Sequence, residues 1–162
     1  MKQNSEIQFN HNKFKGDTIM ATFNPYLNFP GNTEEAFTFY KSVFGGEFIA
    51  IQRFKETPVA DQVPVDARDK IMHVSLPIGK GNVLMATDAI ESMGHKLTFG
   101  NNYNISIEAD SKEEAQRLYD KLSAGGKIEQ PIKDEFWGAY FGMFTDRFGT
   151  RWMINYTYPK QK

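Results

Sequence analysis

The stretch that decides the fold occurs twice: Asn32-Thr-Glu-Glu-Ala-Phe-Thr-Phe-Tyr-Lys-Ser-Val-Phe-Gly-Gly46 and Ser111-Lys-Glu-Glu-Ala-Gln-Arg-Leu-Tyr-Asp-Lys-Leu-Ser-Ala-Gly-Gly126. Each copy opens with a residue that caps helix N-termini and carries Glu three positions later, as in a capping box. Each copy closes on a pair of glycines, which suit the left-handed conformation that ends many helices. The pattern predicts helices over residues 32–44 and 111–123.

Both predicted helices carry one apolar stripe, because their apolar residues recur at helical spacing. The stripes consist of Ala36, Phe39, Tyr40 and Val43 in the first helix and of Ala115, Leu118, Tyr119 and Leu122 in the second. Each stripe needs a sheet to cover it.

The repeat continues beyond the helices, since Gly81-Asn-Val-Leu-Met-Ala86 and Gly149-Thr-Arg-Trp-Met-Ile154 both have the pattern of strands. Strands are expected at 22–29, 47–55, 70–78 and 82–88, and again at 102–109, 127–133, 138–145 and 150–157. A long loop at 56–69 is expected to be mobile, and residues 91–101 connect the halves. The sequence thus predicts an α+β fold of two tandem βαβββ modules.

Composition excludes several classes of protein. The formal charge of -1, from 19 basic and 20 acidic residues, indicates no excess of basic residues that would bind nucleic acid or an anionic membrane. The chain has no Cys, which rules out disulfides and thiolate metal sites and suits the cytoplasm. No apolar run is long enough to span a bilayer. We expect residues 1–19 to be a disordered extension and residues 20–158 to form one domain, with modules at about 20–90 and 102–158.

These features resemble the vicinal oxygen chelate superfamily, which includes glyoxalase I, extradiol dioxygenases and bleomycin and fosfomycin resistance proteins. The resemblance covers residues 20–158 and includes Phe39-Tyr40 and Asp146-Arg-Phe-Gly-Thr-Arg-Trp152. The PhnB-like branch is indicated by Tyr26-Leu-Asn-Phe29, Gly31-Asn-Thr-Glu-Glu-Ala36, Met72-His73, Leu84-Met-Ala-Thr-Asp88 and Trp137-Gly138. Members are often labelled 3-demethylubiquinone-9 3-methyltransferase-like. This chain has no glycine-rich nucleotide loop, so methyl transfer is not expected.

The resemblance implies a cup-shaped, mostly antiparallel sheet with four metal-ligand positions on its inner face. Strand alternation assigns to that face Asn24, Tyr26, Asn28, Val83, Met85, Thr87, Asn104, Ser106, Glu108, Arg151, Met153 and Asn155. The implied ligand positions are Asn24, Met85, Asn104 and Met153, which offer neither imidazole nor carboxylate. We therefore predict no metal and no cofactor.

Three further groups of residues near the inner face each allow two interpretations. His73 is either an acid, base or ligand, or a hydrogen-bonded strand residue that orders Tyr26 or a water. Arg151 forms an ion pair with Glu108 across the cup, or it grips a ligand's carboxylate or phosphate. Trp137, with Tyr140 nearby, forms an aromatic wall or packs in the core, while Met85 and Met153 supply a soft floor or fill gaps.

The leading hypothesis is a protein that binds a small organic ligand through the inner-face residues Asn24, Tyr26, Met85, Asn104, Glu108, Trp137, Arg151 and Met153. Homodimerisation is implied by the resemblance alone. The alternative is a lyase or dioxygenase-type enzyme that uses His73, with or without a divalent metal. A purely structural domain is a third class, and it would require the cup to be filled by side chains.

Overall fold

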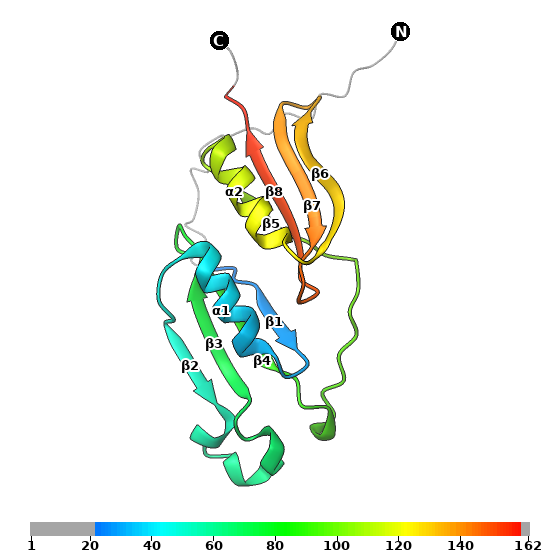
Figure 1. The fold of residues 1–162 in the computed structure, drawn as a ribbon. Coiled ribbons are helices and arrows are strands. Elements are labelled where there is room, and N and C mark those ends of the chain that lie inside the picture. The colour runs from blue at the N-terminus through cyan, green and yellow to red at the C-terminus, as the bar shows by residue number, and fades with distance from the viewer. Residues whose placement is uncertain (1–21, 160–162) are drawn as a thin grey trace, which may run out of the picture.

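The computed structural model describes residues 22–159 and contains two βαβββ modules (Figure 1). The first comprises β1 (Tyr26–Phe29), α1 (Thr33–Phe44), β2 (Ala50–Arg53), β3 (Ile71–Pro77) and β4 (Val83–Asp88). The second comprises β5 (Ile105–Glu108), α2 (Lys112–Ser123), β6 (Lys127–Glu135), β7 (Ala139–Thr145) and β8 (Arg151–Thr157). The predicted α+β fold of tandem modules is confirmed. The segment expected to be disordered, residues 1–19, lies outside the described residues.

The strands form two separate four-stranded sheets with the same topology. Sheet A has the order β1-β4-β3-β2 and sheet B the order β5-β8-β7-β6. In each sheet the first and fourth strands of the module run parallel, and the other pairs are antiparallel. Consequently β1 and β5 are edge strands, one in each sheet.

Each helix covers one face of its own sheet, as Figure 1 shows for α1 over sheet A and α2 over sheet B. The helix-facing strand residues are fully or almost fully buried, among them Phe29, Val74, Leu84, Phe144, Trp152 and Ile154. Burying a side chain of this size contributes roughly 1.5–3 kcal/mol. The opposite faces, turned away from the helices, are called here open face A and open face B.

The two modules share this core, because α1 of the first module also touches the β7–β8 turn of the second. The rings of Phe39 and Phe148 lie 5.7 Å apart, as do those of Tyr40 and Trp152. Asp146 is buried at the same contact and accepts hydrogen bonds from the Tyr40 hydroxyl at 2.7 Å and the Trp152 indole at 2.8 Å. Burial, reinforced by this carboxylate, strongly raises the pKa of Tyr40.

The N-terminus of α1 differs from the sequence expectation. The Asn32 side chain makes no capping hydrogen bond. Instead Asp88, at the end of β4, accepts from the backbone N–H of Thr33 at 3.0 Å and from its hydroxyl at 2.6 Å. The N-terminus of α2 is capped as expected, since Ser111 Oγ accepts from the Glu114 N–H at 3.1 Å.

The segment expected to be a mobile loop has regular local structure. It contains the 3-10 turns η2 (Ala60–Gln62) and η3 (Val65–Ala67) and follows η1 (Phe54–Glu56). These turns enclose a second small core of Phe54, Val63, Ala67 and Ile90, against which Met72 packs. The apolar residues of this stretch therefore order it, despite its two prolines.

Candidate functional site

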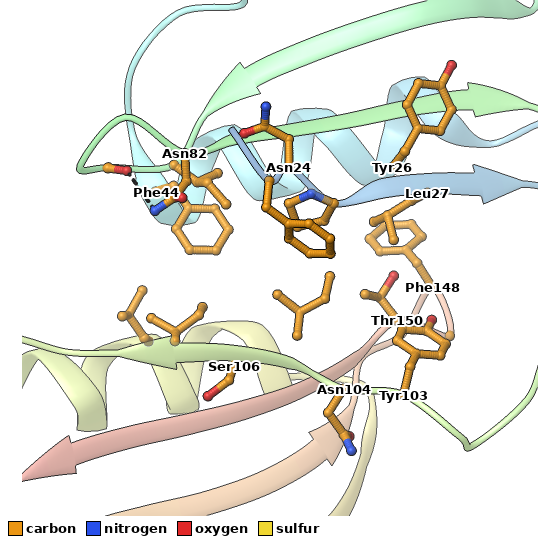
Figure 2. A pocket seen from close by; sticks show the side chains of 18 of the residues that line it. Asn24, Tyr26, Leu27, Phe44, Asn82, Tyr103, Asn104, Ser106, Phe148 and Thr150 are labelled. Atoms are coloured by element: carbon orange, nitrogen blue, oxygen red, sulfur yellow. Dashed lines mark hydrogen bonds between the residues drawn. The ribbon is translucent and has the colours of Figure 1, made fainter. Parts of the chain in front are cut away.

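A cleft of about 1160 Å³ lies between the two modules, bounded by the edge strands β1 and β5 (Figure 2). Its apolar walls come from both modules and from the β7–β8 turn. They include Leu27, Phe44, Ile105, Ile107 and Phe148. Edge strands line the cleft because neither β1 nor β5 has a strand neighbour on its outer side. The cleft therefore exists because the two sheets do not pair with each other.

Amide and hydroxyl groups surround these apolar walls, and Figure 2 labels Asn24, Tyr26, Asn82, Asn104 and Ser106 among them. The side chain of Asn24 is already engaged, because its Oδ1 accepts from the Val83 N–H at 3.0 Å. Burial raises the pKa of Tyr26, which stays a neutral phenol. Asn104 Oδ1 is buried and has no hydrogen-bond partner within residues 22–159. In Figure 2 the Asn104 amide points away from the middle of the cleft, whereas the Tyr103 ring points into it.

The charged side chains that line the cleft are mostly paired with each other. Lys80 donates to Asp110 and so links the two modules, and Arg117 lies 3.8 Å from Glu114 on α2. Glu108 is the exception, since none of the ion pairs among residues 22–159 includes it. This end of the cleft therefore has a surplus negative charge.

Hydrogen bonds hold the Glu108 carboxylate in place. Its two oxygens accept from the Thr157 N–H at 2.9 Å and from the Asn155 amide. Burial by itself would raise the pKa of Glu108, but these hydrogen bonds, with Lys80 nearby, keep it below its ordinary value. Glu108 is thus an ionised acceptor at physiological pH.

The predicted ion pair between Glu108 and Arg151 is wrong. The Arg151 guanidinium instead binds Glu129 of β6 through two hydrogen bonds of 2.5 Å. Glu129 lies at an irregularity in the β6–β7 register, between Ile128 and Gln130. Because Glu129 neutralises Arg151, the structure does not favour this arginine as an anchor for an anionic ligand.

The remaining predicted site residues lie on the open faces, apart from one another. On open face A, Met85 is in register with Tyr26, and the His73 ring centroid lies 6.0 Å from that of Tyr26. On open face B, Met153 pairs with Met143. The cleft therefore brings together Asn24, Tyr26, Asn104 and Glu108 from the predicted set, while His73, Met85, Trp137, Arg151 and Met153 do not line it.

Trp137 stands at the tip of the β6–β7 hairpin, where it forms part of an exposed aromatic group. Its ring packs edge-on against Phe141 at 5.8 Å and Phe136 at 5.0 Å. Trp137 is 52% exposed and Phe136 96% exposed. Of the two alternatives for Trp137, the aromatic wall fits this position better than core packing. Sequence reasoning missed Phe136 and Phe141, although strand alternation through Met143 would have placed Phe141 on the same face.

The four positions at which the resemblance implies metal ligands do not fit a hard or borderline divalent ion. Asn24 and Asn104 offer amides, Met85 and Met153 offer thioethers, and the Asn24 oxygen is taken by the Val83 N–H. No three His, Asp or Glu side chains come together as a possible metal site within residues 22–159. In the same range, no helix is long and apolar enough to cross a membrane.

Comparison with known proteins finds chains that are similar to this one over most of its length. The family model described as "Glyoxalase/Bleomycin resistance protein/Dioxygenase superfamily" matches residues 22–154. Protein YjdN of Escherichia coli K12 is 32% identical over 139 residues, which are 81% of this chain and 92% of the relative.

Two solved structures are also similar. Protein PA1353 from Pseudomonas aeruginosa is 41% identical, with a TM-score of 0.75 over 85% of this chain and 98% of the other. A protein of Bacillus cereus described as a putative 3-demethylubiquinone-9 3-methyltransferase, PhnB protein, is 24% identical, with a TM-score of 0.68 over 85% of this chain and 100% of the other. At that identity the second likeness concerns the fold.

Proposed function

Because this chain belongs to the Glyoxalase/Bleomycin resistance protein/Dioxygenase superfamily, we propose that it binds a small organic molecule in the cleft between its modules. The observation that carries the proposal is the cleft itself, with about 1160 Å³ of space between β1 and β5. Sites for small molecules are mostly apolar, hold roughly 300–1000 Å³ and contain a few polar groups that fix the ligand's orientation. This cleft has that composition and is large enough.

The side chains of the cleft have distinct parts in this proposal. Leu27, Ile107 and Phe148 give apolar contact, whose burial drives binding. The Tyr103 hydroxyl, whose ring Figure 2 shows turned into the cleft, can donate to or accept from a polar group of the ligand.

A neutral apolar dye tests this proposal. Nile red fluorescence should rise on titration with the protein. The Thr98→Trp variant, which fills the cleft from the linker between the modules, should weaken binding by about tenfold, or about 1.4 kcal/mol. Ser92→Trp, on the same linker but outside the cleft lining, is the matched control. Equal binding by both variants, or no binding by the unmodified protein, would refute the cleft as a ligand site.

We also propose that the protein is a homodimer. Superfamily members often form dimers, and several large apolar side chains are exposed in the single chain, among them Ile49 at 64%, Ile51 at 43% and Phe136 at 96%. Covering such side chains is a common result of association. Sedimentation velocity at micromolar concentration should give twice the mass of one chain, and a monomer would remove the proposal.

We also propose that the protein is cytoplasmic, since a chain without Cys forms no disulfides and so suits a reducing compartment. Cell fractionation should recover it with cytoplasmic markers. Recovery with periplasmic or extracellular material would contradict this location.

A further inference from the structure

Residues 96–103 form a strap along the cleft between the modules. They follow η4 (Glu91–Met93) and precede β5, and Figure 1 draws this part of the chain as a coil that leads to the second module. Every residue of the strap except Leu97 is exposed to solvent. The strap nevertheless contributes to the cleft lining, through Leu97, Thr98, Phe99, Gly100 and Tyr103. One thickness of chain therefore separates the cleft from solvent on this side.

Few hydrogen bonds hold the strap in place. Within residues 22–159, no bond between backbone groups includes any residue of the strap. Its one hydrogen bond to a neighbouring element comes from Arg151, whose Nε donates to the Tyr103 carbonyl at 3.2 Å. Segments with exposed, unpaired backbone open at a low cost in free energy. The strap can therefore move without breaking a strand or a helix.

The other walls of the cleft are fixed by the fold. Leu27 and Ile107 lie on β1 and β5, each of which pairs with a neighbouring strand along its length. Phe148 is buried and packs against Phe39 of α1. Moving any of these side chains would disturb the shared core. The strap is thus the part of the cleft that can open.

Phe99 holds the strap against the β7–β8 turn. Its ring lies directly on Gly149, because a Cβ at that position would come within 2.9 Å of Phe99 Cε1 and 3.0 Å of Cδ1. The ring remains 58% exposed, so the contact is shallow. At the other end of the strap, Gly94 has a φ of +86°, which glycine adopts more readily than other residues. The strap therefore runs from a permissive hinge to a weak aromatic contact.

We propose that residues 96–103 form a lid that opens to admit a ligand to the cleft, and that Phe99 seated on Gly149 is its latch. The lid rests on the proposed function, because it controls access to the same cleft. Lids of this kind set the rates of ligand entry and release rather than the chemistry of the site.

Stopped-flow fluorescence with Nile red tests the latch. Phe99→Ala should raise the association rate constant about threefold, because a larger fraction of molecules then has an open strap. Phe136→Ala removes the same side chain from the hairpin tip, outside the cleft lining, and should leave the rate unchanged. If Phe99 only contacted the ligand, its removal would change the dissociation rate alone. An unchanged association rate in Phe99→Ala would therefore overturn the latch.

A cross-link tests the movement of the lid itself. The chain has no Cys, so the double variant Asn101→Cys/Thr145→Cys carries only two thiols. Asn101 of the strap and Thr145 of β7 border one small hollow, together with Phe99 and Gly149. Joining them with bismaleimidoethane should slow Nile red association at least about fivefold, because the strap can no longer open. The same variant capped with N-ethylmaleimide is the control, and equal rates in the two samples would overturn the lid.

The equilibrium fluorescence of Nile red with the unmodified protein separates failure of the lid from failure of the proposed function. Binding at equilibrium, with association rates that neither Phe99→Ala nor the cross-link alters, would remove the lid and leave the cleft as a ligand site. A lack of binding to the unmodified protein would remove both proposals.

Discussion

Asp146 is the residue on which the contact between the modules most depends. Besides Tyr40 and Trp152, it accepts from the backbone N–H groups of Phe148 at 2.8 Å and Thr150 at 3.0 Å. Asp146→Asn keeps the shape of the side chain, but it replaces one acceptor oxygen with an NH2 group. That group would face the N–H and O–H donors that now bind the carboxylate. We expect a loss of about 2–4 kcal/mol in the free energy of unfolding, measured with urea. Asp66→Asn, on an exposed turn, should change it by less than about 0.5 kcal/mol.

The ion pairs of single residues were the hardest feature to predict from the sequence. Strand alternation correctly placed Glu108 and Arg151 on one face of the second module. It did not identify their partners, because alternation assigns side chains to faces and not to one another. Arg151 binds Glu129 of β6, which is 22 residues away in the sequence. The partner of Glu108 was therefore wrong although its position was right.

At the scale of elements, the two helices begin by different means. Asp88 accepts from Thr33 and also from the Ile71 N–H at 2.8 Å, so it joins α1 to β3 and β4. Asp88→Ala would leave these buried donors without partners and should cost about 2–4 kcal/mol in urea unfolding. Asn32→Ala should cost less than about 0.5 kcal/mol, because Asn32 makes no capping bond. A larger effect at Asn32 than at Asp88 would refute this assignment.

The helices and strands were well predicted, because the internal repeat gives the sequence pattern of one module twice. Helix 111–123 was expected and α2 spans Lys112–Ser123; strand 150–157 was expected and β8 spans Arg151–Thr157. The capping role of Asn32 failed because its competitor, Asp88, is 55 residues away from Thr33 in the sequence. Local patterns give the ends of elements, and long-range hydrogen bonds decide which side chain satisfies them.

At the scale of the molecule, the shared core predicts that the modules unfold together. Phe39 and Tyr40 of the first module pack on Phe148 and Trp152 of the second. We therefore propose that residues 20–158 behave as one domain, with a single transition whose calorimetric and van't Hoff enthalpies agree. Two separate transitions would show that each module folds alone.

The separation of the sheets was not evident from the sequence, since strand patterns reveal faces but not which edges pair. Leu27, Ile105 and Ile107, which alternation turns away from the inner face, line the cleft between β1 and β5. The sequence thus indicated residues of the candidate site, such as Asn24, Tyr26 and Asn104. It did not indicate the cavity that joins them.

Amide chemical-shift mapping by NMR tests the central claim most directly. On titration with Nile red, the account predicts that the largest shifts occur in residues 24–28 and 104–108, on both sides of the cleft, while Ser92 and Glu113 stay unchanged. Shifts confined to one module, or to the outer faces of α1 and α2, would contradict a ligand site between the modules.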